Sequence, residues 1–253
     1  MHNSRLSFLG VEITNRLLAT EMVFESGEYW HILGPNGAGK STLLLALSGL
    51  IPAKELLYDG INFQNKSLLE QARMRSLLSQ NHGTEFDIPS SQLLYFFTTY
   101  TTLPSELDAS LEINDLLGKS LATMSGGQQQ RFHIARCILQ IYSELNEGRG
   151  ILILDEPLQG LDIKHQHQVL ALLKGFCEKG NLVVMTSHDI NMSAKYASHV
   201  ALLKNSNVVF HGRKQDCLSP DQLTNVFDVC FSFNQEGKEA SSQYFDTQSK
   251  QTN

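Results

Sequence analysis

One segment of the chain combines glycines, a lysine and a hydroxyl in the spacing of a phosphate-binding loop, G-x-x-x-x-G-K-[ST]. Glycines let backbone N–H groups approach phosphate oxygens, while a lysine and a hydroxyl at the start of a helix can hold phosphate charge and Mg²⁺. The pattern predicts a nucleotide site without distinguishing kinases, GTPases and transport ATPases. The segment consists of Gly34, Pro35, Asn36, Gly37, Ala38, Gly39, Lys40 and Ser41, and Thr42 follows it.

Two adjacent carboxylates end a second apolar run. Asp155 and Glu156 directly follow residues 151–154, which read Ile-Leu-Ile-Leu. Acids at the carboxyl end of a buried parallel strand point toward the crevice in which such folds bind ligands. Asp155 is suited to hold Mg²⁺ through water, and Glu156 is suited to polarise an attacking water molecule. With the phosphate loop, this pair predicts nucleotide hydrolysis.

A third segment predicts a second anion-binding site. A serine N-cap followed by two glycines exposes backbone N–H groups at the start of a predicted helix over 129–141. One chain does not need two phosphate-binding helix ends for a single nucleotide. The segment consists of Ser125, Gly126, Gly127 and Gln128.

These three segments together resemble the ATP-binding cassette family. Its signature is L-S-G-G-Q, and this chain departs mildly from it with Met124 at the first position. In that family the signature of one subunit caps the γ-phosphate held by the other. The resemblance therefore implies a head-to-tail homodimer with two ATP molecules and Mg²⁺ at its interface.

Further family elements follow in the expected order. Gln80, after a predicted strand over 76–79, is similar to the glutamine that senses Mg²⁺ and the lytic water. Asp162 ends a loop, 158–162, that resembles the D-loop and would position the opposite subunit's site; Gln159 departs from the small residues usual there. His188 matches the switch histidine that bonds the γ-phosphate. The resemblance implies catalytic roles for Glu156, His188 and Gln80, and metal contacts from Ser41, Gln80 and Asp155.

Short apolar runs bounded by turn residues alternate with helical stretches, which predicts an α/β fold. Strands are expected at 29–33, 151–154 and 182–185, and a hairpin turn at 204–207. The resemblance implies an ATPase core with a mostly parallel sheet, an antiparallel β subdomain and an inserted helical subdomain. We expect one cassette domain over 1–232, with the helical insert at about 84–124, and a polar C-terminal tail over 233–253.

The composition excludes several classes of protein. The chain has 253 residues and a net charge of −6, whereas a nucleic-acid-binding domain usually shows a basic excess. Its apolar runs are far shorter than the roughly 20 residues of a membrane helix, and no signal peptide is recognisable. The four cysteines lack disulfide or zinc spacing and are expected to be buried. A role at a membrane would therefore be that of a peripheral subunit.

Within the family, the chain looks most like the ATPase subunits of cobalamin (vitamin B12) importers. The likeness rests on an extended segment between Ser125 and Asp155, which lie 30 positions apart, and on the sequence SHDIN after the strand predicted over 182–185. It implies two ATPase subunits, two membrane permease subunits and a periplasmic cobalamin-binding protein, at the cytoplasmic face of the bacterial inner membrane. A siderophore or haem importer, a soluble cassette ATPase and a non-catalytic regulatory cassette are the alternatives.

Three assignments stay open at the sequence level. No aromatic residue stands in the segment 11–18, where the family commonly stacks adenine. His165 and His167 lie two apart on a predicted helix and so face different directions, which disfavours a metal site. Four apolar residues of the helical insert suit either a groove for a membrane subunit or the core: Leu93, Leu94, Phe96 and Phe97.

Overall fold

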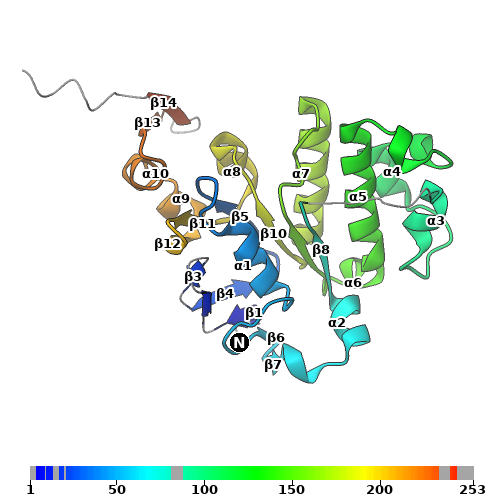
Figure 1. Ribbon diagram of the computed structural model, residues 1–253, viewed down its shortest axis with the longest axis horizontal. Coiled ribbons are helices and arrows are strands. Elements are labelled where there is room, and N and C mark those ends of the chain that lie inside the picture. Colours follow the sequence, from blue (N-terminus) through cyan, green and yellow to red (C-terminus); the bar gives the residue numbers. More distant parts are fainter. Residues whose placement is uncertain are drawn as a thin grey trace, which may run out of the picture.

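A computed structural model describes residues 4–8, 10–13, 17–19, 21–80, 88–233 and 240–243. Its centre is an eight-stranded sheet with the order β2-β3-β12-β11-β5-β10-β9-β8 (Figure 1). In that order the strands are Val11–Ile13, Leu17–Ala19, Asn207–Arg213, His199–Lys204, Tyr29–Leu33, Leu182–Thr186, Ile151–Leu154 and Arg75–Leu78.

The five strands β11, β5, β10, β9 and β8 run parallel. Every residue of β5, β9 and β10 is buried, as expected for strands covered by helices on both faces. This explains why each appears in the sequence as a short, unbroken apolar run. Their carboxyl ends meet at one edge of the sheet, where the segments that follow them can form a common site.

A second sheet is antiparallel and has the order β4-β1-β6-β7. The strands are Met22–Glu25, Ser4–Phe8, Leu57–Tyr58 and Ile61–Asn62. Apolar side chains from this sheet and from α1 (Lys40–Leu47) form one buried cluster with β5, β9 and β10. The predicted fold class, an α/β ATPase core with a mostly parallel sheet and an antiparallel β part, is confirmed.

Short helices precede α5 (Gly126–Gln140) in the region where the helical insert is expected. They are α3 (Ser90–Tyr95), α4 (Ser105–Leu111) and the 3₁₀ turns Asn114–Leu116 and Leu121–Thr123. They lie on the side of α5 away from the sheet (Figure 1), and their leucines join the buried cluster of α5 and α7 (Ile163–Glu178). Residues 84–87 of the expected insert lie outside the described residues.

The remaining helices are short. They are α2 (Leu68–Met74), α6 (Tyr142–Asn146), α8 (Ile190–Tyr196), α9 (Lys214–Cys217) and α10 (Pro220–Phe227), with a 3₁₀ turn at Phe63–Asn65. Strands β13 (Cys230–Phe233) and β14 (Ala240–Gln243) pair in antiparallel fashion, so this ribbon crosses the expected boundary between the cassette domain and the tail. Among the described helices, none is both long and apolar enough to cross a membrane.

The expectation that all four cysteines are buried is wrong for one of them. Cys137, Cys177 and Cys217 are buried, whereas Cys230 is exposed. Cys230 opens strand β13, whose only partner within the described part of the chain is β14. A two-stranded ribbon has little apolar surface under which a side chain can be covered.

His31 is a fully buried titratable residue of strand β5. Ser193 Oγ donates to the Asp189 carbonyl over 2.8 Å, so His31 Nδ1 must be the donor in its own 2.9 Å contact with Ser193 Oγ. Nε2 is buried and has no hydrogen-bond partner among the described residues. Burial, with a smaller contribution from Lys214, lowers the pKa of His31 to about 3. The imidazole is therefore neutral in the folded protein.

This buried imidazole makes stability depend on pH. The unfolded chain takes up a proton near the ordinary pKa and the folded chain does not, so stability falls as the pH drops below about 6.5. We expect the wild type to lose about 2 kcal/mol between pH 7 and pH 5 through this group. His31→Asn should show a correspondingly shallower pH dependence in urea unfolding. Equal slopes for the two proteins would contradict this assignment.

Candidate nucleotide-binding and hydrolysis site

The predicted phosphate loop connects β5 to α1. Gly34 has φ +155°, and a Cβ at that position would lie 2.3 Å from the Leu203 carbonyl oxygen of β11. Gly39, with φ +96°, is the N-cap of α1. Both positions require glycine, because a side chain would clash at the first and strain the backbone at the second. The loop therefore places the N-terminus of α1, with its exposed N–H groups, at the carboxyl edge of the sheet.

Lys40 closes the loop onto itself. Its Nζ donates to the carbonyl oxygens of Gly34 over 2.8 Å and Pro35 over 3.1 Å. Burial lowers the pKa of Lys40, and the nearby carboxylates of Glu156 and Asp155 oppose that shift. The ammonium group thus lies at the base of the loop, where its positive charge would stabilise a bound phosphate.

The two predicted carboxylates have different side-chain partners. Asp155 is buried, and its Oδ1 accepts a 2.7 Å hydrogen bond from the Thr186 hydroxyl. The same hydroxyl accepts a 2.6 Å hydrogen bond from the Glu156 backbone N–H. Thr186 ends β10, the strand beside β9, so it links both acids across two strands. Sequence reasoning missed Thr186, whose only signal is a hydroxyl at the end of an apolar strand.

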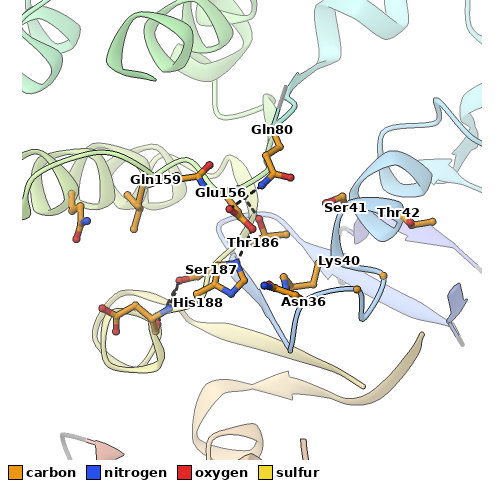
Figure 2. A pocket seen from close by; sticks show the side chains of 15 residues that line it. Asn36, Lys40, Ser41, Thr42, Gln80, Glu156, Gln159, Thr186, Ser187 and His188 are labelled. Carbon is orange, nitrogen blue, oxygen red and sulfur yellow. Dashed lines mark hydrogen bonds and ion pairs between the residues drawn. The ribbon is translucent and has the colours of Figure 1, made fainter. Parts of the chain in front are cut away.

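Glu156 adopts an unusual backbone conformation, with φ +47°, which is costly for a residue with a side chain. Its carboxylate lies between Gln80 and His188, with Lys40 and Ser41 on the other side of the pocket (Figure 2). His188 Nε2 is 2.7 Å from Glu156 Oε1, and Gln80 Nε2 donates to Oε2 over 3.2 Å. Both carboxylate oxygens are therefore oriented by side chains that the sequence had singled out.

A cavity of about 870 Å³ contains this arrangement. Nine of the predicted site residues line it: Asn36, Gly37, Gly39, Lys40, Ser41, Thr42, Gln80, Glu156 and His188. The lining does not include Gly34, Pro35, Ala38, Asp155, Asp162, Ser125, Gly126, Gly127 or Gln128. The predicted phosphate loop thus shares one cavity with Gln80, Glu156 and His188, whereas the signature segment does not line it.

The signature segment forms the N-terminus of α5, where Ser125 and Gln128 form a capping box. Ser125 Oγ accepts from the Gln128 N–H over 3.3 Å, and Gln128 Oε1 accepts from the Ser125 N–H over 2.9 Å. Gln130, which the sequence did not single out, donates to the carbonyl oxygens of Glu156 and Pro157 at 3.3 and 3.1 Å. The helix that begins after Ser125 is therefore tied to the backbone of Glu156 and Pro157.

The loop expected to act as a D-loop lies against the signature. A Cβ on Gly127 would approach the Gly160 carbonyl oxygen to 2.8 Å, so a glycine is needed for this close packing. Asp162 caps α7, and its Oδ1 accepts from the His165 N–H over 2.8 Å. Leu158 and Gln159, at the other end of the loop, line the cavity.

The oxygen donors of the cavity suit Mg²⁺ bound together with a nucleotide. Ser41 lines the cavity beside Lys40, and the Asp155 carboxylate lies at the same edge of the sheet. Within the described ranges, no group of three or more His, Cys, Asp or Glu side chains could hold a metal on its own. Mg²⁺ typically takes one or two protein ligands and completes its shell with phosphate and water. The residues present fit that mode of binding.

The open assignments receive different answers. Phe96 and Phe97 are 72% and 62% exposed, whereas Leu94 is buried and Leu93 is partly buried. The core interpretation thus holds for the leucines but not for the phenylalanines.

His165 and His167 have different partners, as their spacing implies. The segment 11–18, where adenine stacking was considered, lies partly outside the described residues, and no Phe, Tyr or Trp lines the described cavity.

The hydroxyl of Thr186 should be important for turnover. In Thr186→Val, the buried Asp155 oxygen and the Glu156 N–H lose their shared partner, which costs about 1–3 kcal/mol. We expect kcat to fall about 10- to 100-fold, because the lost hydrogen bonds fix the positions of the two acids. Steady-state ATPase assays measure the effect. Thr186→Ser, which keeps the hydroxyl, is the matched control and should retain most activity; equal loss in both variants would contradict the role.

Comparison with known proteins identifies the family. The profile of the family described as "ABC transporter" matches residues 17–159. The "Vitamin B12 import ATP-binding protein BtuD" of Yersinia pseudotuberculosis is 34% identical over 242 residues, covering 92% of this chain and 96% of that protein. The protein with the same description from Vibrio cholerae is 34% identical over 227 residues, covering 86% and 90%.

A solved structure agrees in fold. It is described as an inward-facing conformation of a metal-chelate type ABC transporter, and it has a TM-score of 0.74 with 21% identity, covering 96% of this chain and 98% of that chain. The predicted phosphate loop, the carboxylates at the edge of the sheet and the signature helix thus occur in a chain that matches the family over more than half its length. The protein belongs to the ABC transporter family and is one of its ATPases.

Proposed function

We propose that this protein hydrolyses ATP at a site shared between two copies of the chain and thereby drives import across a membrane. The observation that carries the proposal is the division of the site. Lys40, Ser41 and Glu156 share one cavity, while the capped N-terminus of α5 with Ser125 lies outside it. A second copy, placed head to tail, would bring its own signature segment over the open side of the cavity.

The chain's own residues would act as follows. The phosphate loop and Lys40 bind the β- and γ-phosphates, and the partner's signature N–H groups close over the γ-phosphate. Glu156 accepts a proton from the attacking water, and its carboxylate is already oriented by His188 and Gln80. Ser41 and Asp155 would hold Mg²⁺, which would supply positive charge to the bound phosphates. Loss of phosphate removes the bridge between the copies, and the dimer reopens.

The proposed cargo is vitamin B12. Two relatives at 34% identity, each covering most of this chain, are described as vitamin B12 import ATP-binding proteins. The solved structure of a metal-chelate type transporter supports the alternative of a siderophore or haem importer. We propose that two ATPase subunits act with two membrane permease subunits and a periplasmic cobalamin-binding protein. The ATPase would then be a peripheral subunit at the cytoplasmic face of the bacterial inner membrane.

The exposed pair Phe96 and Phe97 of the helical insert supports contact with a permease. Their rings pack edge to face with centroids 4.7 Å apart, and both stay largely exposed in the isolated chain. Large apolar side chains exposed together commonly mark a protein interface. In the proposed complex, the permease would cover this pair.

Uptake of labelled cobalamin tests the cargo. Cells that lack the gene should lose uptake, and the wild-type gene should restore it while Glu156→Gln should not. Labelled ferric siderophore and haem are the parallel substrates. Unchanged cobalamin uptake in the deletion, together with lost siderophore or haem uptake, would replace the proposed cargo and leave the ATPase assignment intact.

A further inference from the structure

One side chain joins the D-loop to the helical region before α5. His165 lies on the first turn of α7, and its side chain is 13% exposed. Its Nδ1 is 2.8 Å from Asp162 Oδ2, and its Nε2 is 3.2 Å from Glu112 Oε2. The imidazole ring is thus placed between two carboxylates that lie 50 positions apart in the sequence.

Glu112 is the second anchor of this contact. It is the C-cap of α4 and has φ +50°, a conformation that residues with side chains rarely adopt. Its carboxylate also accepts from Lys164 Nζ over 2.7 Å and from Arg131 Nη1 over 3.2 Å. Hydrogen bonds from Lys164 and then His165 lower the pKa of Glu112 to about 2. Glu112 therefore remains an ionised acceptor at neutral pH.

Arg131 extends the network to the signature helix. It is a buried residue of α5, and its Nη1 donates to the Leu111 carbonyl over 2.6 Å as well as to Glu112. Helices α4, α5 and α7 lie side by side (Figure 1). A continuous set of polar contacts therefore runs from the loop that lines the cavity, through Asp162, His165 and Glu112, to the helix that begins with Ser125.

We propose that His165 is a positioning residue that fixes the D-loop to the helical region, so that the loop and the signature helix move together when the site closes. The contacts of the two His165 ring nitrogens hold Asp162 and Glu112 at a fixed separation. This inference rests on the proposed role of the D-loop at the dimer interface. His165 does not line the cavity, so its effect on hydrolysis is transmitted through the loop.

Steady-state ATPase measurements on the full chain test this role. In His165→Ala we expect kcat to fall about tenfold with little change in the KM for ATP, because the nucleotide contacts are untouched. The bond from the His165 backbone N–H to Asp162 Oδ1 survives any substitution except proline, so α7 stays capped. His167→Ala is the matched control: its ring contacts Tyr196 over 2.7 Å instead of the D-loop, and its kcat should match the wild type.

Two amide variants separate the contacts. His165→Asn offers an amide N–H near the position of Nδ1, and His165→Gln offers one near Nε2, so each keeps one carboxylate partner. If both contacts are required, both variants lose activity; wild-type kcat in either one would overturn the proposal. These variants also decide the question if His165→Ala fails to fold.

A double-mutant cycle with Glu112→Ala completes the test. Because both residues act in one chain of contacts, the double variant should be no slower than the slower single variant. Additive losses would overturn the proposal. The proposed function itself would be contradicted if the wild-type chain had no ATPase activity, or if its activity did not depend on Glu156. The two failures are therefore distinguishable.

Discussion

Replacement of Glu156 by glutamine is expected to reduce ATP turnover about 10²- to 10⁴-fold while leaving ATP binding nearly unchanged. The amide cannot accept the proton of the attacking water, but it has nearly the same shape as the carboxylate. It can still contact Gln80 and His188, which lie 3.2 and 2.7 Å from the two oxygens. Because hydrolysis no longer reopens the dimer, ATP should hold the variant as a dimer.

Single-turnover hydrolysis and sedimentation with ATP measure these two effects. Glu178→Gln is the matched control, since it makes the same chemical change at an exposed position on α7, 3.7 Å from Lys174. Its turnover should match that of the wild type. Unchanged turnover in Glu156→Gln would remove Glu156 from the proposed base position, and a loss of ATP affinity equal to the loss of turnover would assign it to binding.

Lys40→Ala is expected to cause the largest loss of ATP affinity. The ammonium group is buried at the base of the phosphate loop, between the Gly34 and Pro35 carbonyls. Removing one partner of a buried charged contact costs about 2–5 kcal/mol, which corresponds to an affinity loss of roughly 30- to several-thousand-fold. The two carbonyl oxygens would also lose their donor, so the loop itself should become less well ordered.

Titration with a fluorescent ATP analogue measures this affinity. Lys174→Ala is the control, because its exposed pair with Glu178 contributes only a few tenths of a kcal/mol. The control should bind nucleotide as the wild type does. Affinity within twofold of the wild type in Lys40→Ala would show that the loop binds phosphate without its lysine.

Much of the fold and site could be predicted because the relevant signals are local in the sequence. The phosphate loop is contiguous, and the buried strands β5, β9 and β10 appear as uninterrupted apolar runs. The carboxyl ends of parallel strands meet at one edge, which explains why Asp155, Glu156 and His188, each shortly after a buried strand, come together there. Gln80 follows β8, which pairs with β9, and it reaches the same cavity for the same reason.

The features that were not predicted depend on contacts between distant segments. Thr186 follows a run of apolar residues, and only the pairing of β10 with β9 shows that its hydroxyl reaches Asp155. His165 appeared as one of two unpatterned histidines, and nothing in the sequence indicates that Glu112 lies beside it. Gln130 and the exposed Cys230 likewise have no local pattern that predicts their surroundings.

A mixing experiment tests the shared site most directly. Lys40→Ala disables the phosphate loop of a chain, and Ser125→Arg obstructs the signature segment of a chain. A homodimer of either variant has no intact site. A mixed dimer has one, formed by the phosphate loop of the Ser125→Arg chain and the signature of the Lys40→Ala chain.

ATPase activity of the two variants is measured alone and after mixing in equal amounts. With random pairing, half of the dimers are mixed and each has one of two sites intact, so activity should return to about a quarter of the wild-type value. Activity that stays at the average of the separate variants would contradict a site built from two copies of the chain.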